Sequence, residues 1–276
     1  MHKSGTLAAL HVYPIKSCAG ISVRRLDYTH LGVSFDRELV VVDLDGNVLT
    51  QRDRPRLALV KTHILEDQSL SLSADGVTPY VVPSRAGDAH AAGTVVQVWG
   101  NDVGGIDAGD EAAAWLSSVL QTQCRLLKSD PSFERRSGEA RNGSSARISF
   151  ADGQPLLVIS QESLDSLNER MKARSGLTVP MDRFRPNIVL SGLGAFAEDS
   201  LKTIRCGTLT LHAVEACVRC KMTLIDQESL KMGKEPLGTL ATFRRHAQES
   251  SKVLFGHYFV PEASGFAEVG DTVTAE

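Results

Sequence analysis

The N-terminal part of the chain shows short apolar runs separated by turn-forming residues, which predicts strands rather than helices. Residues 39–43 and 48–50 flank Asp45-Gly46, a pair that is typical of a two-residue hairpin turn. Further strands are predicted at residues 57–64, 69–73 and 95–99. Because no helical period precedes Asp110, this part is predicted to close into an all-β barrel or sandwich.

A helical pattern begins at Asp110 and continues to Leu120. Its apolar residues share one face: Ala112, Trp115, Leu116, Val119 and Leu120. The carboxylate of Asp110 suits the positive end of the helix dipole. We place the boundary between two domains here, with the first domain at residues 1–120 and the second at residues 121–276.

The second part of the chain alternates between strand-like and helical segments. A helix is predicted between Ser160, a good N-cap residue, and Gly176, a good C-cap residue, because its apolar side chains fall on one face. Another helix is predicted to begin at Pro236, which suits the first helical turn. Strands are predicted at residues 155–159, 187–190 and 208–214, and a final strand pair at 259–260 and 269–273.

Two segments without periodicity are predicted to be loops. Residues 84–94 have small side chains and suit a surface loop. Residues 129–145 are rich in Ser, Gly, Arg and Glu and contain little to bury, so we expect a mobile loop. A solvated loop is the simpler interpretation, although Arg135, Arg136 and Arg141 would also suit a lid over an anionic ligand.

The composition is that of an ordinary globular protein, with 42% hydrophobic and 23% charged residues in a chain of 276. A net charge of -3 gives no general attraction to a nucleic-acid polymer or an anionic membrane. Apolar runs are too short to span a bilayer, and the first residues lack the pattern of a signal peptide. We therefore expect a cytoplasmic protein without a membrane anchor, whose basic residues act locally on a small ligand.

The five cysteines are expected to be mostly reduced in that compartment. Cys18, Cys124 and Cys206 lie in mixed surroundings, where a free cysteine is usually a small buried hydrophobic residue. We interpret these three as structural.

The other two cysteines form the segment Cys217-Val218-Arg219-Cys220, which follows the predicted strand 208–214. A zinc site would need a second pair of ligands, and a redox-active dithiol would need a helix N-terminus within a βαβ unit. Neither is visible in the sequence. Spacing alone therefore favours structural cysteines, while the charges of Arg219 and Lys221 favour thiolates and a soft metal.

Residues 191–197 match the pattern G-x-G-x-x-A of dinucleotide-binding turns. Glu198 and Asp199 would face the pyrophosphate, and the segment up to Gly207 is too short for a crossover helix. Ordinary turn glycines explain this segment better.

Three basic positions lie beside predicted turns or strand ends. Lys16 and Ser17 follow the first strand, and Arg37 and Arg185 each precede a strand. Taken singly, each is best interpreted as an exposed charge. Together they could hold a phosphate, because arginine makes bidentate contacts and lysine provides a point charge, with the amide of Asn187 for orientation.

Motifs in this order extend over nearly the whole chain: LHVYPIKSC at 10–18, FRPNIV at 184–189, CVRC at 217–220, FGHYF at 255–259 and VGD at 269–271. They resemble the MOSC family, in particular the amidoxime-reducing proteins of bacteria and mitochondria. The resemblance implies a mainly β (α+β) fold, with an N-terminal β-barrel domain followed by a MOSC β-barrel domain with a few peripheral helices.

The resemblance also implies a molybdenum cofactor, with the metal ligated by the thiolate of Cys220, while Cys217 is a neighbour and not a ligand. The residues that would hold the pterin and its phosphate are Lys16, Ser17, Arg37, Arg185 and Asn187. Gly153-Gln154 matches a further family position that approaches the cofactor.

The activity implied by the resemblance is reduction of N-hydroxylated compounds, such as amidoximes, hydroxylamines and N-hydroxylated bases, with release of water. We expect this chain to act without the N-terminal anchor of the mitochondrial proteins and without the C-terminal ferredoxin-like domain of some bacterial ones. Electrons are therefore expected from a separate donor, a flavin reductase with a ferredoxin or a b-type cytochrome.

Two alternatives remain open. The chain could carry activated sulfur as a persulfide on Cys220 or Cys217, as relatives in molybdenum-cofactor sulfurases are thought to do. It could also bind and deliver the molybdenum cofactor without turnover. The natural substrate and the oligomeric state do not follow from the sequence.

Overall fold

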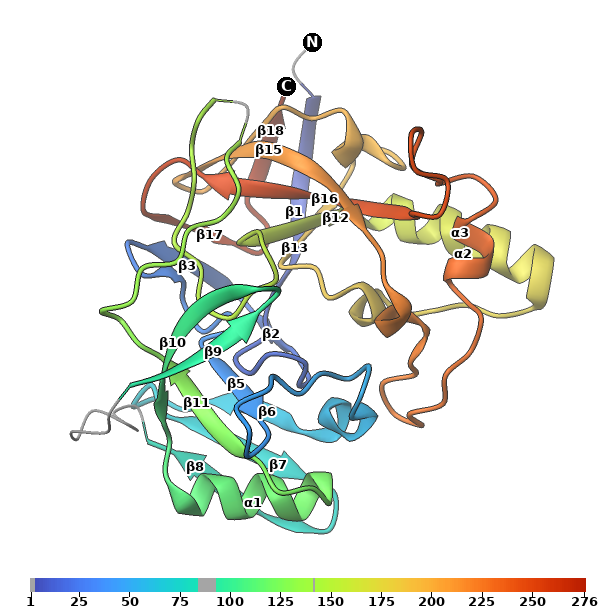
Figure 1. Cartoon of the computed structure of the whole chain (residues 1–276). Helices are drawn as coiled ribbons and strands as arrows, with labels where there is room; N and C mark the ends of the chain where they lie inside the picture. Colours follow the sequence, from blue (N-terminus) through green and yellow to red (C-terminus); the bar gives the residue numbers. More distant parts are fainter. Residues whose placement is uncertain (1–2, 84–92, 141) are drawn as a thin grey trace.

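Strands from both ends of the chain close a seven-stranded β-barrel in the computed structural model, which describes residues 3–83, 93–140 and 142–276 (Figure 1). The ring runs β13, β12, β16, β15, β14, β18 and β1, and pairing of β1 with β13 closes it, while β2 pairs with β1 outside the ring. The strands are β1 (Lys3–Val12), β2 (Ile21–Val23), β12 (Leu156–Ser160), β13 (Ile188–Ser191), β14 (Thr203–Cys206), β15 (Leu209–Val218), β16 (Leu254–Pro261) and β18 (Thr272–Ala275).

One crossover helix connects the parallel pair of this barrel. Strands β12 and β13 run parallel, and such a pair requires a long connection, which α2 (Gln161–Ser175) provides. The Ser160 side chain accepts a hydrogen bond from the backbone N–H of Ser163, and Gly176 ends the helix in the left-handed conformation. This helix is confirmed at both predicted ends.

The barrel interior is filled by alternate residues of its strands. In β15, Leu209, Leu211 and Ala213 are buried while their neighbours are partly exposed, as the alternation predicts. Leu7 and Leu10 of β1 belong to the same hydrophobic core. The first strand of the chain is therefore an integral part of the C-terminal barrel.

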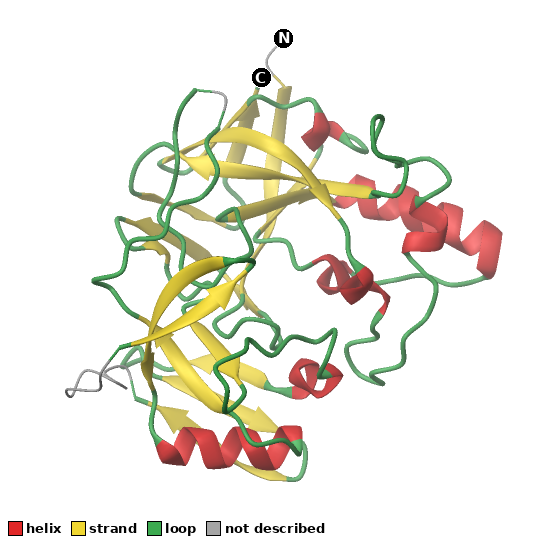
Figure 2. Cartoon of the chain, in the orientation of Figure 1, coloured by secondary structure: helices red, strands yellow, loops and turns green. Residues whose placement is uncertain are grey.

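The intervening part of the chain forms an open half-barrel (Figure 2). One sheet has the order β5 (Leu39–Val42), β11 (Arg125–Ser129), β10 (Asn101–Asp107) and β9 (Thr94–Val98), and the other the order β6 (Lys61–Ile64), β7 (Leu70–Ala74) and β8 (Val77–Val82). Helix α1 (Asp110–Leu120) has the predicted bounds and buries Leu116 in the same core as Val41 and Leu72.

Strand pairing crosses between the two parts of the molecule. A small sheet joins β3 (Arg25–Thr29) and β4 (Gly32–Val33) to the C-terminal β17 (Gly265–Glu268). Strand β11 lies after α1, and hence after the predicted boundary, but pairs with β5 and β10 in the half-barrel. The domain division at residue 120 remains a prediction, and the mainly β fold is confirmed.

Three predictions about strands differ from the structure. The 3₁₀-helix η1 (Pro55–Leu59) occupies the first half of the segment 57–64, where proline at the start favours a helical turn. Residues 48–50 contribute only an isolated bridge between Val48 and Val42. The segments 259–260 and 269–273 do not pair with each other, because β16 pairs with β12 and β15, whereas β18 pairs with β1 and β14.

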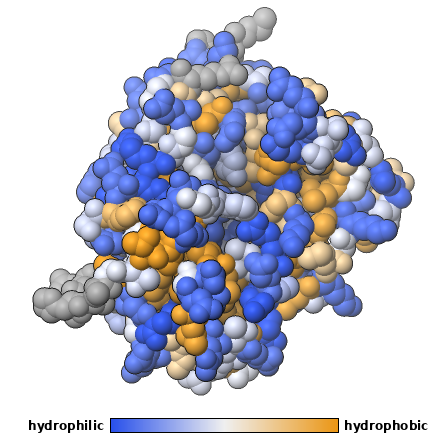
Figure 3. All heavy atoms as spheres, viewed as in Figure 1, coloured by the Kyte–Doolittle hydropathy of each residue, from blue (hydrophilic) through white to orange (hydrophobic). Residues whose placement is uncertain are grey.

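The remaining helices are short and peripheral: α3 (Leu237–Leu240), η2 (Met181–Phe184), η3 (Ala197–Asp199) and η4 (Lys221–Leu224). The predicted helix at Pro236 is thus a single turn that ends before Phe243. None of the helices in the described ranges has the length and apolar character needed to span a bilayer. Figure 3 shows a largely hydrophilic face with hydrophobic areas over the half-barrel and beside α2 and α3.

The segment 129–145 corrects a prediction, because several of its side chains are buried. The Arg135 guanidinium donates to the backbone carbonyls of Ser149, Ala151 and Asp152 at 2.9, 2.6 and 2.8 Å. Such contacts fix the segment against the chain that follows it, so Arg135 is no lid residue. Arg136 is partly exposed and pairs with Glu134. The predicted loop at 84–94 falls mostly, and Arg141 entirely, outside the described residues.

Candidate functional site

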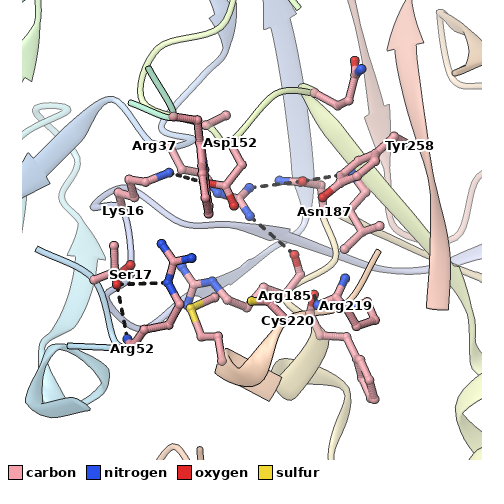
Figure 4. A pocket seen from close by; sticks show the side chains of 17 residues that line it. Lys16, Ser17, Arg37, Arg52, Asp152, Arg185, Asn187, Arg219, Cys220 and Tyr258 are labelled. Atoms are coloured by element: carbon pink, nitrogen blue, oxygen red, sulfur yellow. Dashed lines mark hydrogen bonds and ion pairs between the residues drawn. The ribbon is translucent and has the colours of Figure 1, made fainter. Parts of the chain in front are cut away.

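A cleft lies where the barrel meets the half-barrel, and both parts contribute side chains to it (Figure 4). The first part of the chain supplies Lys16, Ser17, Arg37, Thr50, Arg52 and Trp99. The second supplies Ala151, Asp152, Gln154, Leu157, Phe184, Arg185, Asn187, Arg219, Cys220, Met222 and Tyr258. All the site residues predicted from the sequence line this cleft except Gly153, which lies between two lining residues.

Lys16 and Asp152 form an ion pair on one wall of the cleft, in which the Lys16 side chain is buried and the Asp152 side chain is 59% exposed. The Lys16 ammonium donates to the carboxylate of Asp152 at 2.5 Å and to the carbonyl of Phe150 at 2.8 Å. Desolvation by the surrounding protein would raise the pKa of Asp152, but the charge and hydrogen bond of Lys16, and the indole N–H of Trp99, hold it well below its usual range. Burial lowers the pKa of Lys16. An ammonium has three donors, so one remains for a ligand.

Arg37 is held by a buried carboxylate behind the cleft. One guanidinium nitrogen contacts both oxygens of Asp36, at 2.6 and 2.5 Å, and the amide oxygen of Asn187 at 3.2 Å. The same carboxylate accepts hydrogen bonds from the Asn187 amide at 2.9 Å and from the backbone N–H of Tyr13 at 3.0 Å. This network fixes the orientation of Arg37 and Asn187 before any ligand binds.

Arg185 lies beside this network with most of its hydrogen-bonding capacity unused. A guanidinium has five donors, and among the described residues the Arg185 guanidinium donates one hydrogen bond, to the carbonyl of Cys18 at 2.6 Å. The side chains of Arg185 and Arg37 both stack on the ring of Tyr13, at 4.1 and 4.3 Å from its centroid. Burial and the nearby Arg37 lower the pKa of Arg185 to about 10, which leaves it charged at neutral pH.

The backbone is strained where several of these side chains arise. Ser17, Arg37, Trp99 and Arg185 have φ values of 67°, 51°, 53° and 56°, in the left-handed region that non-glycine residues seldom adopt. Such conformations persist only where the surrounding structure enforces them, and they are common at binding sites. The strain therefore supports a functional interpretation of this cleft.

The two cysteines of the segment 217–220 differ sharply. Cys217 is buried at the end of β15, where its sulfur accepts a hydrogen bond from Arg219 at 2.9 Å. Cys220 is exposed, begins the 3₁₀-helix η4 and lines the cleft. The thiols therefore have different surroundings, which favours separate roles rather than a shared metal site. Within the described ranges, no three His, Cys, Asp or Glu side chains are arranged to hold a metal ion.

Several other residues of the cleft were not identified from the sequence. Asp152 is oriented by its ion pair with Lys16, and Tyr258 is a partly buried phenol whose pKa is raised by burial and by nearby Cys217. Arg219, which the sequence linked only to the two cysteines, also donates to the backbone carbonyl of Phe184 at 2.8 Å. Arg52 and Trp99 come from the half-barrel and face the cleft together. A signal was present for Trp99, because Trp-Gly occupies a hairpin turn, but nothing local linked it to the other residues.

The segment 191–197 does not form a dinucleotide-binding turn. It follows β13 and leads into η3, a single 3₁₀ turn, and not into a crossover helix. Glu198 is buried and accepts hydrogen bonds from Ser163 at 2.8 and 3.0 Å. The glycines of this segment therefore have a structural role.

The cations of the cleft suit an anionic ligand. The exposed cysteine suits a soft metal ion carried by the same ligand. Among the described residues, the Arg185 guanidinium donates to the carbonyl of Cys18 and that of Arg52 to the hydroxyl of Thr50, and neither is paired with a carboxylate, so both can receive an anion. Two buried polar atoms, Nε of Arg219 and Oε1 of Gln154, also lack a hydrogen-bond partner there. Such atoms are costly to leave unsatisfied, which indicates that a bound group completes the site. The exposed thiol of Cys220 can supply a soft metal with a ligand.

Comparison with known proteins gives matches along the whole chain. The model of the MOSC N-terminal beta barrel domain matches residues 4–123, and that of the MOSC domain matches residues 145–274. Mitochondrial amidoxime-reducing component 1 of Mus musculus is 36% identical over 99% of this chain and 83% of its own length. Molybdenum cofactor sulfurase of Arabidopsis thaliana is 32% identical over 91% of this chain but only 32% of its own length. Among solved structures, the YUAD protein from Bacillus subtilis aligns with 100% of this chain and 97% of its own, at 11% identity and a TM-score of 0.47.

Proposed function

Because the chain belongs to the family of MOSC-domain proteins that carry an MOSC N-terminal β-barrel domain, we propose that it is a molybdenum-cofactor-dependent reductase of N-hydroxylated compounds. The observation that carries the proposal is the presence, in one cleft, of an exposed cysteine and several cations, of which Lys16 and Arg185 are buried. Similarity to amidoxime-reducing proteins over 99% of the chain supports the reaction class.

The cations of the cleft would bind the anionic end of the cofactor. Arg185 offers unused donors, Lys16 has one donor left, and Arg37 is fixed by Asp36. Arginine suits the bidentate contacts of a phosphate. The amide of Asn187 keeps Arg37 in place, so these residues require little rearrangement on binding. Ser17 and the loop at Gly153-Gln154 are proposed to approach the pterin.

At the other end, the Cys220 thiolate would ligate molybdenum, and the bound cofactor would supply the two-electron chemistry. Cys217, buried against Arg219, would keep this segment in position without touching the metal. The overall reaction takes up two electrons and two protons, breaks the N–O bond of the substrate and releases water.

The electrons are proposed to come from a separate protein, a flavin reductase with a ferredoxin or a b-type cytochrome. A direct test is to produce the chain in a host that makes the molybdenum cofactor and to measure bound molybdenum together with conversion of benzamidoxime to benzamidine. About one molybdenum per chain and reduction of benzamidoxime are expected. The same protein from a cofactor-deficient host is the control, and metal-loaded protein that does not reduce N-hydroxylated compounds would overturn the proposal.

Similarity to a molybdenum cofactor sulfurase and the exposure of Cys220 favour a second candidate function. In it, Cys220 carries a persulfide, or the chain carries the cofactor without turnover. Persulfide trapping by alkylation and mass spectrometry separates these cases. Trapped sulfur on Cys220 without bound molybdenum would favour sulfur transfer, whereas bound molybdenum without reductase activity would favour a carrier.

A further inference from the structure

Trp99 occupies a backbone position that disfavours its own side chain. It is the first residue of the two-residue turn between β9 and β10, and both Trp99 and Gly100 have positive φ, at 53° and 78°. Turns of this kind prefer asparagine or glycine at the first position. A tryptophan in this strained backbone position indicates that its side chain has a function.

The Trp99 side chain is anchored at one edge and largely uncovered elsewhere. Its indole nitrogen donates to the carboxylate of Asp152 at 2.8 Å, yet the residue is 60% exposed. The second tryptophan, Trp115, also donates to a backbone carbonyl, that of Thr78, but packs against the hydrophobic core of the half-barrel. Trp99 is therefore a fixed aromatic surface that no core residue covers.

The position of Trp99 connects two adjoining clefts. It lines the cleft that contains Cys220 and also a shallower groove between the half-barrel strands and the loop after β5, with Lys16, Thr50 and Arg52 common to both. The Arg52 guanidinium lies 4.6 Å from the centroid of the Trp99 ring. Anything that passes from the groove towards Cys220 therefore meets the ring of Trp99 and the charge of Arg52.

We propose that Trp99, anchored by Asp152 and flanked by Arg52, is a specificity-determining residue that stacks on the planar aromatic part of the substrate at this rim. The inference rests on the proposed function, because it takes the reacting group to be the one presented to Cys220. Indole rings bind planar groups well, since they offer a large apolar face at a small entropic cost. The favoured substrates are accordingly aryl and heteroaryl N-hydroxy compounds rather than alkyl ones.

A pair of variants isolates the ring from its hydrogen bond. Trp99→Phe and Trp99→Leu both lose the donor to Asp152, but only the leucine variant loses the aromatic face. For each we compare kcat/KM for benzamidoxime with that for acetamidoxime in the molybdenum-loaded protein. The ratio should fall by about tenfold in Trp99→Leu and by less than about threefold in Trp99→Phe, in line with the usual strength of aromatic contacts. Equal ratios in the two variants would overturn the proposal.

Fluorescence gives a readout that needs no turnover. The chain has only two tryptophans, so Trp115→Phe leaves Trp99 as the sole emitter. Without a reductant, benzamidoxime should change the Trp99 emission with saturation, whereas acetamidoxime should leave it unchanged. An equal response to both compounds, or none to either, would contradict stacking on Trp99. Because the fluorescence titration involves no reduction, it tests binding at Trp99 even if the protein proves not to be a reductase.

Molybdenum content distinguishes substrate stacking from stacking on the cofactor. If Trp99 binds substrate, the metal content per chain of Trp99→Leu and Trp99→Phe should agree with that of wild type. Loss of molybdenum in Trp99→Leu, with retention in Trp99→Phe, would assign the ring to the pterin instead and overturn the proposed role in substrate choice.

Discussion

The two ends of the cleft are built in opposite ways. At one end, Asn187 and Arg185 are buried, and Arg37 is partly buried and held by Asp36 and Asn187. The backbone of both arginines has a positive φ. At the other, Cys220 is exposed, and among the described residues it is held only through its backbone carbonyl, which accepts hydrogen bonds from Thr223. A rigid array of cations is suited to hold an anion in place, whereas an open thiol is suited to react or to ligate.

The same contrast exists between two thiols. Cys18 belongs to the cationic end, where its carbonyl binds Arg185, and its side chain is completely buried. Burial raises the pKa of Cys18 to about 12, so this thiol stays protonated at neutral pH despite the nearby Arg185. Proximity to a cation therefore does not suffice for a reactive cysteine, and exposure to the cleft distinguishes Cys220.

The largest expected effect comes from removing the open thiol. Cys220→Ala should abolish both molybdenum retention and reduction of benzamidoxime, because no other thiol faces the cleft among the described residues. Cys217→Ala, three positions away, is the matched control and should keep its metal, since Cys217 is buried against Arg219. Metal analysis and turnover of both variants test this. Equal loss in both would mean that the cysteines act together.

The next effect concerns the rigidity of the cationic end. Asp36→Asn would leave the partly buried Arg37 without its buried carboxylate partner, and loss of one member of such a pair typically costs roughly 3–5 kcal/mol of unfolding free energy. The exposed pair of Arg25 and Asp27 provides a control, because Asp27→Asn should cost less than about 1 kcal/mol. Denaturant unfolding measures both. Similar losses in the two variants would show that burial of Asp36 gives the cationic end no special rigidity.

What the sequence could predict at the two ends depends on how local the determinants are. Helix α2 was predicted at both ends because its caps lie next to it in the chain. Lys16, Arg37 and Arg185 could be proposed because each lies in a short motif beside a turn. Whether they hold a cofactor is still a prediction, although the structure brings them into one cleft.

Residues that depend on distant contacts were missed. The hydrogen bond from Trp99 to Asp152 joins the half-barrel hairpin to the loop before β12, and no local pattern could reveal it. The prediction of the last strand pair was wrong for the same reason. Strand β18 pairs with β1 and β14, and this order depends on closure of the whole barrel. The segment 129–145 looked too polar to be buried. Arg135 is nevertheless buried, because the backbone carbonyls that accept its hydrogen bonds lie further along the chain.

A smaller effect is expected from removing one cation without disturbing the network. Arg185→Gln should weaken retention of the cofactor by about tenfold or more, because one or two charge-assisted hydrogen bonds are lost. Arg205→Gln removes the same charge from the exposed surface of β14 and is the control. Molybdenum content after extended dialysis measures retention. If both variants lose metal alike, net charge and not the geometry of the cleft holds the anion.

The smallest effect is a difference in pH dependence that comes from the buried thiol of the cationic end. Between pH 9, the ordinary pKa of a thiol, and about 12, folded Cys18 keeps a proton that the unfolded chain loses, so stability should fall as pH rises through this range. One such group contributes a slope of about 1.4 kcal/mol per pH unit. Cys18→Ala should be less stable at neutral pH, through lost packing, but should decline less steeply above pH 9. Denaturant unfolding from pH 7 to 10.5 tests this, with Cys220→Ala as the control for loss of an exposed thiol. If the unfolding free energies of wild type and Cys18→Ala fall in parallel with pH, the Cys18 thiol ionises as readily in the folded protein as in the unfolded chain. The contrast between the two ends of the cleft would then not extend to their thiols.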